Sequence, residues 1–235
     1  MKLLKLLFAS VLILASSATF AQTADEVIEK HIAALGGRDA LSKVNSLYME
    51  STLDVMGNQA PAVTYAVNGK GYKSEVEFNG SKIIQCVTDK GGWSVNPMMG
   101  SSTPEPMPDD QYKNAKTNLF VTTPLLDYKK NGYAVELLPK EGESIRLKLV
   151  SPDKVESVYF LDPASHLLQK VTASANMQGQ PVEVTTTFAD YKKADGGMMI
   201  PHRMEVDLGQ FTLSYAVNKI EVNKSIDPSI FEMPK

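Results

Sequence analysis

The sequence predicts a mainly β protein of the α+β class, in which a helix precedes a curved antiparallel sheet. Twelve short segments alternate apolar and polar residues with a period of two, as half-buried strands do. Asn-Gly and Gly-Gly turn signals separate many of them at hairpin spacing. One earlier segment repeats apolar residues every three or four positions, which is typical of an amphipathic helix. So many strands are expected to curl into a barrel or a half-barrel, because curling limits the exposed edges.

The composition is that of a globular protein and excludes several functional classes. The 235 residues are 43% hydrophobic and 22% charged, which is enough to bury a core. The formal net charge of −3 provides no basic surface for nucleic acid. The single cysteine, Cys86, excludes an internal disulfide framework and any site built from several thiolates.

Residues 1–21 have the pattern of a secretory signal peptide. Two lysines precede an apolar run, Leu6–Ala15, and small residues lead to Ala21. The run is too short for a permanent anchor, and no later run approaches the roughly 20 apolar residues of a transmembrane helix. We therefore expect export to the periplasm, cleavage before Gln22 and one mature domain, residues 22–235.

The first predicted element is a helix that begins at Thr23. Thr23 and Glu26 have the spacing of a capping box, in which each side chain satisfies a backbone donor of the other residue. Apolar residues then recur on one face as far as Leu35. Gly36 and Gly37 supply a left-handed stop. The apolar stripe predicts that one face of this helix is buried.

The predicted strands follow the helix and continue almost to the C-terminus. In the first strand Met49 and Leu53 face inward, and in the second Tyr65 does so. In the last strand the apolar parity changes near Asn218, which predicts a β-bulge and strong curvature there. The strands are predicted at residues 47–55, 63–67, 72–78, 83–88, 93–95, 133–138, 145–150, 157–161, 167–175, 182–191, 200–208 and 211–222.

One long insertion, Asn96–Asp127, interrupts the strands. It contains five prolines, and its part from Asp109 to Phe120 favours a helix. A long insertion without strands in a β protein is more often a lid, a plug or a binding loop than an idle linker.

The sequence contains no recognisable catalytic or cofactor motif. A nucleophile elbow, a phosphate-binding loop and a zinc-protease motif are all missing. The three histidines fall on separate elements: His31 beside the helix stripe, His166 in a solvated turn and His202 on the apolar face of a strand. Cys86 lies among apolar neighbours and is expected to be inert. We therefore expect no enzymatic activity, no metal and no cofactor.

Five groups of short segments, spread over nearly all of residues 22–235, resemble a known family. They are Val27–Gly37, Tyr159–Pro163 with Leu167–Val171, Asp190-Tyr191, Gly196-Gly197 with Ile200-Pro201, and Asp227–Phe231. Together they resemble the outer-membrane lipoprotein-sorting (Lol carrier-like) superfamily. The resemblance implies an incomplete β-barrel, closed by the N-terminal helix and the helical insertion, around an apolar cavity that carries acyl chains. The resemblance also implies a gating arginine in an early strand. No residue is assigned this role here, because Arg38 precedes the strands and Arg146 and Arg203 come late in the sequence.

The expected function is non-enzymatic transport in the periplasm. An apolar cavity would hold the acyl chain of a lipid or lipoprotein, with a role in outer-membrane lipoprotein sorting and biogenesis. The alternative is an interaction module that offers the same concavity to another protein of a cell-envelope complex. Neither nucleic acid nor stable insertion into a membrane is expected. The candidate cavity and lid residues are Met49, Leu53, Tyr65, Val76, Phe78, Trp93, Met98, Met99, Phe120, Leu147, Phe188, Met204, Phe211 and Leu213.

Overall fold

A computed structural model describes residues 22–177 and 180–234 of the chain. The predicted signal peptide, residues 1–21, lies outside the described residues. Within the described ranges, no helix is both long and apolar enough to cross a membrane.

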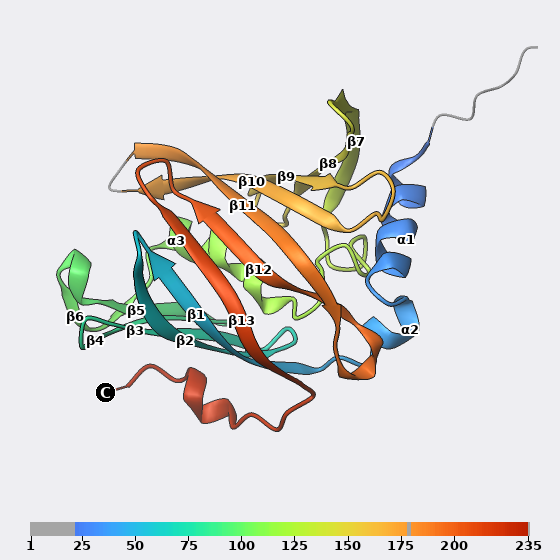
Figure 1. Ribbon diagram of the computed structural model, residues 1–235. Coiled ribbons are helices and arrows are strands. Elements are labelled where there is room, and N and C mark those ends of the chain that lie inside the picture. The colour runs from blue at the N-terminus through green and yellow to red at the C-terminus, as the bar shows by residue number, and fades with distance from the viewer. Residues whose placement is uncertain (1–21, 178–179, 235) are drawn as a thin grey trace, which may run out of the picture.

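The described residues form one antiparallel sheet of thirteen strands that curves without closing into a barrel. Strands β1 and β13 pair at its centre, and β6 and β7 are its two edges. The sheet curls around α3 (Figure 1). This arrangement confirms the predicted half-barrel. The strands are β1 (Ser46–Val55), β2 (Asn58–Val67), β3 (Gly71–Phe78), β4 (Ser81–Thr88), β5 (Gly92–Asn96), β6 (Ser101–Pro106), β7 (Ala134–Glu141), β8 (Ser144–Val150), β9 (Glu156–Leu161), β10 (Leu168–Met177), β11 (Gln180–Lys193), β12 (Met199–Asp207) and β13 (Thr212–Val222).

The helices are few and short. In the first of them, Thr23 and Glu26 form the predicted capping box. Gly36 and Gly37 follow this helix with φ angles of 122° and 90°, a backbone region that favours glycine. The helices are α1 (Ala24–Ala34), α2 (Arg38–Leu41) and α3 (Asp109–Ala115), with 3₁₀ turns η1 (Pro97–Met99), η2 (Lys116–Leu119), η3 (Asp195–Gly197) and η4 (Pro228–Phe231).

The strand register divides the side chains between a concave and a convex face, because directly opposed residues of antiparallel strands point the same way. At one end of the concave face, α1 and the segment after η2 fill the half-barrel. Ile28 and Ile32 of α1 and Leu125 of that segment pack there against Leu147 and Leu161. All five side chains are at most 2% exposed. This plugged end is the main hydrophobic core.

The C-terminal tail covers part of the convex face. Ile230 and Phe231 pack against Trp93 and Cys86 of the neighbouring strands β5 and β4. The indole Nε1 of Trp93 donates a hydrogen bond of 2.9 Å to the carbonyl oxygen of Phe231. Cys86 is fully buried, and burial raises the pKa of its thiol to about 11. The thiol is therefore protonated at neutral pH.

Two local features decide how the sheet bends and ends. The pairing of β1 with β13 shifts between Glu50 and Ser51, where Asn218 is the extra residue; this confirms the predicted bulge. Strand β6 was not predicted, since Pro104 and Pro106 argue against a strand. Proline is tolerated in β6 because this strand is an edge of the sheet.

Candidate functional site

The uncovered end of the concave face is the candidate functional site. One register row there joins five strands through Phe188, Met204, Tyr215, Leu53 and Ala60. We call this end the open concave surface. It comprises Leu53, Val55, Ala60, Ala62, Val76, Phe78, Ile83, Phe188, Met204, Val206, Leu213 and Tyr215. Leu53, Ala60, Ala62 and Val76 are buried among the others, and the rest of the set is partly buried.

The burial pattern shows that the other end, beneath α1 and the segment after η2, is covered most completely. On β8 the concave residues Ile145, Leu147 and Leu149 are all buried beneath the plug. On β13 the concave residues, among them Leu213 and Tyr215, are only partly buried. The open concave surface therefore keeps apolar area in contact with solvent, and a ligand that covers this area gains free energy by removing it from water.

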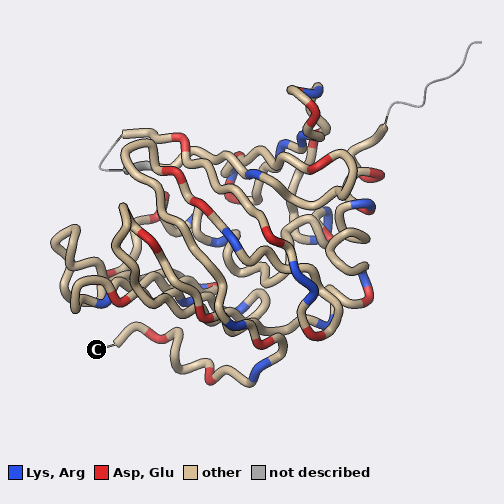
Figure 2. Tube along the Cα trace, in the orientation of Figure 1, with Lys and Arg blue, Asp and Glu red and all other residues tan. Residues whose placement is uncertain are grey.

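Charged side chains on the central strands lie on the opposite face from the open concave surface. On β1, for example, Glu50 and Asp54 alternate with concave Met49 and Leu53. No Lys, Arg, Asp or Glu occupies a described concave position on β1–β4, β10 or β13. The same holds for β11 up to Phe188 and for β12 from Met204 onward. Figure 2 shows where the charged residues occur along the strands. This distribution suits a ligand without charge.

Two tyrosines add hydroxyl groups to the concave face. Burial raises the pKa of the Tyr72 phenol, and the neighbouring Ser74 and Thr64 side chains oppose this rise. Burial also raises the pKa of Tyr215 to about 12, with a smaller contribution from Tyr72. Both phenols are therefore neutral at physiological pH. Sequence reasoning missed these two residues, although the alternation of apolar residues along their strands includes both.

Most of the predicted cavity residues share the concave face. Met204 and Leu53 lie in one row, and Leu213 lies near the start of β13. Phe211 precedes β13 and is 37% exposed. Leu147 faces the same way but is completely buried beneath the plug. The residues placed on the concave face by strand register are Met49, Leu53, Val76, Phe78, Leu147, Phe188, Met204 and Leu213.

The predicted placement of Tyr65 and Trp93 in the cavity is wrong. Both side chains lie on the convex face, where Trp93 is 4% exposed beneath the C-terminal tail and Tyr65 packs beside it. The small residues Ala60, Ala62 and Ala66 occupy the concave face of β2 instead. Tyr65 and Val67 of β2 pack in the convex cluster with Trp93 and Phe231, so the larger residues of this strand do not identify its concave face.

The predicted lid residues occupy two places. Met98 and Met99 form the 3₁₀ turn between β5 and β6 and are 65% and 64% exposed. Phe120 follows η2, and its ring packs edge-on against Tyr133 with the centroids 5.7 Å apart. The insertion itself covers part of the concave face, since Ala115 and Leu119 pack over Val87.

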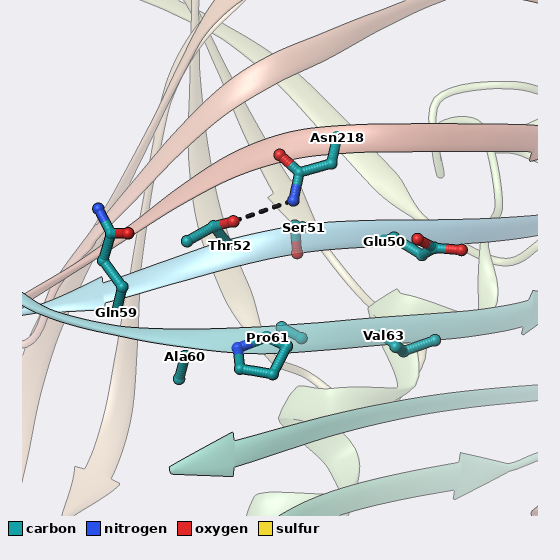
Figure 3. Close-up of a pocket in the computed structure, with 9 residues that line it drawn as sticks. Glu50, Ser51, Thr52, Gln59, Ala60, Pro61, Val63 and Asn218 are labelled. Atoms are coloured by element: carbon teal, nitrogen blue, oxygen red, sulfur yellow. Dashed lines mark hydrogen bonds between the residues drawn. The ribbon is translucent and has the colours of Figure 1, made fainter. Parts of the chain in front are cut away.

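Two surface depressions are present, of which the first shares Ala60 and Ala62 with the open concave surface. One, of about 350 Å³, is lined by Glu50, Thr52, Gln59, Pro61 and Asn218 among others. Figure 3 shows the hydrogen bond there from the Asn218 amide to the Thr52 hydroxyl, which measures 2.9 Å. Its lining combines these side chains with Ser51, Ala60, Ala62 and Val63.

The other depression, of about 530 Å³, lies between α1 and residues 125–130. Arg38 forms ion pairs of 2.6 Å with both Glu29 and Asp127 across it. Lys129 pairs with Asp25 at 2.8 Å and, with the Tyr128 hydroxyl, lowers the pKa of that carboxyl. These groups are largely exposed, so each pair contributes little to stability. Their positive and negative side chains already pair with one another.

The histidines do not converge on one site. His31 was expected at the boundary of the helix stripe but is buried. Its Nδ1 donates a hydrogen bond of 2.8 Å to the carbonyl oxygen of His166. Burial lowers the pKa of His31, so its imidazole is neutral. His202 is partly buried, with Nδ1 3.0 Å from the carbonyl oxygen of Ile200. Within residues 22–177 and 180–234, no group of three or more His, Cys, Asp or Glu side chains could hold a metal ion.

Solved structures with the same fold come from several bacteria. A LolA superfamily protein of Nitrosomonas europaea is 11% identical, with a TM-score of 0.58 over 90% of this chain and 98% of that one. A DUF1329 family protein of Desulfovibrio piger is 12% identical, with the same TM-score and coverage. A putative outer membrane lipoprotein-sorting protein domain of Vibrio parahaemolyticus is 15% identical, with a TM-score of 0.54 over 88% and 94%.

These similarities confirm, at the level of the fold, the predicted resemblance to the lipoprotein-sorting superfamily. They extend over about nine-tenths of the chain. No protein-family model and no curated protein sequence matches the chain.

Proposed function

We propose that this protein is a non-enzymatic periplasmic carrier that holds the acyl chain of a lipid or lipoprotein against its open concave surface. The observation that carries the proposal is an apolar row on the concave face in which Phe188, Met204 and Tyr215 keep part of their surface exposed, while Leu53 and Ala60 of the same row are buried. The charged residues of β12 and β13 point to the opposite face.

The energetics favour a ligand with a long hydrocarbon chain. Each methylene group removed from water contributes about 0.8 kcal/mol, so a chain of several methylenes binds well without any charged contact. A curved sheet suits such a chain, because strands on both sides of β1 and β13 offer apolar side chains to it. Binding by shape and apolar area requires no chemical step, which is why the proposal is a carrier and not an enzyme.

The proposed location and route rest on two further observations. The N-terminal residues 1–21 have the sequence pattern of an exported protein. Two of the structures with the same fold are described as a LolA superfamily protein and a putative lipoprotein-sorting domain. We therefore place the protein in the periplasm and propose lipid or lipoprotein transport towards the outer membrane as its role.

Placing a carboxylate on the open concave surface tests this proposal. The Leu213→Asp variant should bind a neutral, fluorescent naphthylamine probe at least about tenfold more weakly, because an apolar ligand would then cover an unpaired charge. Ser214→Asp is the matched control, since Ser214 is the next residue and points to the convex face. Probe affinity is measured by fluorescence titration, and thermal unfolding of both variants separates lost binding from lost folding.

The results distinguish the two faces of the sheet. Weaker probe binding by folded Leu213→Asp, with Ser214→Asp unchanged, supports the proposal. Equal affinities in both folded variants would place the bound probe elsewhere and contradict it.

Native mass spectrometry of protein purified from a lysate that contains membranes addresses the natural ligand. A co-purified lipid would support the carrier. A stoichiometric protein partner without lipid would instead support an interaction module of a cell-envelope complex.

A further inference from the structure

A row of polar side chains crosses the concave face between the open concave surface and the insertion. Thr64, Ser74, Gln85 and Ser94 are successive register partners on β2, β3, β4 and β5. We call them the polar row. Apolar residues flank it on both sides along the strands: Val76 and Ile83 on one side, and Tyr72 and Val87 on the other.

The polar row lies within reach of the apolar row that holds Leu53. Along β1 the two rows are separated by the four residues from Leu53 to Met49, because Met49 is the register partner of Thr64. At about 3.3 Å per residue this separation is about 13 Å. Ser74 and Gln85 lie two and three strands away from β1, which adds about 10 Å and about 14 Å across the sheet. A ligand that covers the Leu53 row therefore needs a chain of about 16–19 Å to present a polar group to Ser74 or Gln85.

The polar row offers hydrogen bonds without charge. Thr64 is 8% exposed, whereas Ser74 and Ser94 are partly exposed. Gln85 is exposed on the same face, where its amide can both donate and accept. A hydroxyl, an ester or an amide of a ligand finds matching partners here.

The lysines of the insertion's helical part are already paired, and the charged register partner of the polar row has the wrong sign for an anion. Lys113 of α3 pairs with Asp109 at 2.6 Å. Lys116 of η2 pairs with Asp153 at 2.7 Å. At the sheet edge, Glu105 is the register partner of Ser94 and adds negative charge. An ionised carboxylate or phosphate placed on this row would lose water without gaining a cationic partner.

We propose that the protein selects ligands whose acyl chain carries an uncharged hydrogen-bonding group, such as an ester, an amide or a hydroxyl, and that the polar row binds this group. The inference rests on the proposed function and specifies its ligand class. The ionised form of a free fatty acid is then a poor ligand, and a neutral monoacylglycerol with the same chain is a good one.

Competition between two lipids of equal chain length tests the inference. Monomyristoylglycerol and myristate are each used to displace the neutral naphthylamine probe at about pH 8, where a carboxyl group is ionised. The wild-type protein should bind the monoacylglycerol at least about tenfold more tightly than myristate, because the myristate carboxylate loses its hydration without gaining a partner. Gln85→Lys should shift this ratio towards myristate by about tenfold, because the new ammonium group pairs with the carboxylate.

Gln59→Lys is the matched control, since Gln59 is exposed and its strand register places it on the convex face opposite Asp54. Equal affinities of the wild-type protein for the two lipids, or equal ratios for Gln85→Lys and Gln59→Lys, would overturn the inference and leave acyl-chain binding intact. Failure of both lipids to displace the probe would overturn the proposed function as well.

Discussion

At Gly71 the absence of a side chain lets the C-terminal tail reach the convex face of the sheet. A Cβ atom there would lie 2.6 Å from Cγ of Phe231, which is closer than such atoms pack. Phe231 in turn accepts the hydrogen bond from the Trp93 indole. The tail therefore depends on a glycine at a position where the backbone itself does not require one.

Gly71→Ala should lower the free energy of unfolding by about 1–3 kcal/mol, because the added methyl displaces the Phe231 ring. The measurement is urea denaturation of the purified protein. Gly91→Ala is the control, since a Cβ at Gly91 meets no atom within 4 Å. Equal losses in the two variants would show that the tail does not sit on Gly71.

Single residues also show where sequence reasoning reached its limit. The alternation of apolar residues correctly placed Leu53, Met204 and Leu213 on one face. It misplaced Tyr65 and Trp93, because the C-terminal tail buries the opposite face of their strands. A period of two identifies the inner face only when the outer face is left to water.

Among the elements, the insertion links the two halves of the curved sheet. Tyr112 of α3 donates a 3.0 Å hydrogen bond to the carbonyl oxygen of Thr88 in β4. Lys116 pairs with Asp153 in the turn between β8 and β9. The sequence predicted this insertion and its helix, but the partners lie far away in the sequence and could not be predicted from local patterns.

Tyr112→Phe should loosen α3 without unfolding the sheet. Loss of this partly buried hydrogen bond is expected to reduce the local opening free energy of α3 by about 0.5–1.5 kcal/mol. Hydrogen exchange of the α3 amides measures the change. In Tyr48→Phe, which removes a hydrogen bond to Glu50 on the convex face, α3 should exchange as in the wild type. Unchanged exchange in Tyr112→Phe would mean that other contacts hold the helix.

At the scale of the whole molecule, the concave face is filled unevenly. Helix α1 and Leu125 complete the core at one end, whereas Phe188 and Met204 remain partly exposed at the other. Strand periodicity predicted the half-barrel but not this division, because the covering segments come from distant parts of the chain. The division is what makes a binding surface available in a protein that still has a well-packed core.

Photo-crosslinking tests most directly whether an acyl chain occupies the open concave surface. A monoacylglycerol with a diazirine in its chain is bound and irradiated, and the labelled peptides are identified by mass spectrometry. The structure predicts labels on the concave residues of β11–β13, such as Phe188, Met204 and Leu213, which a competing unlabelled lipid suppresses. Labels confined to convex residues such as Thr52 and Pro61, or labels that the competitor leaves unchanged, would contradict it.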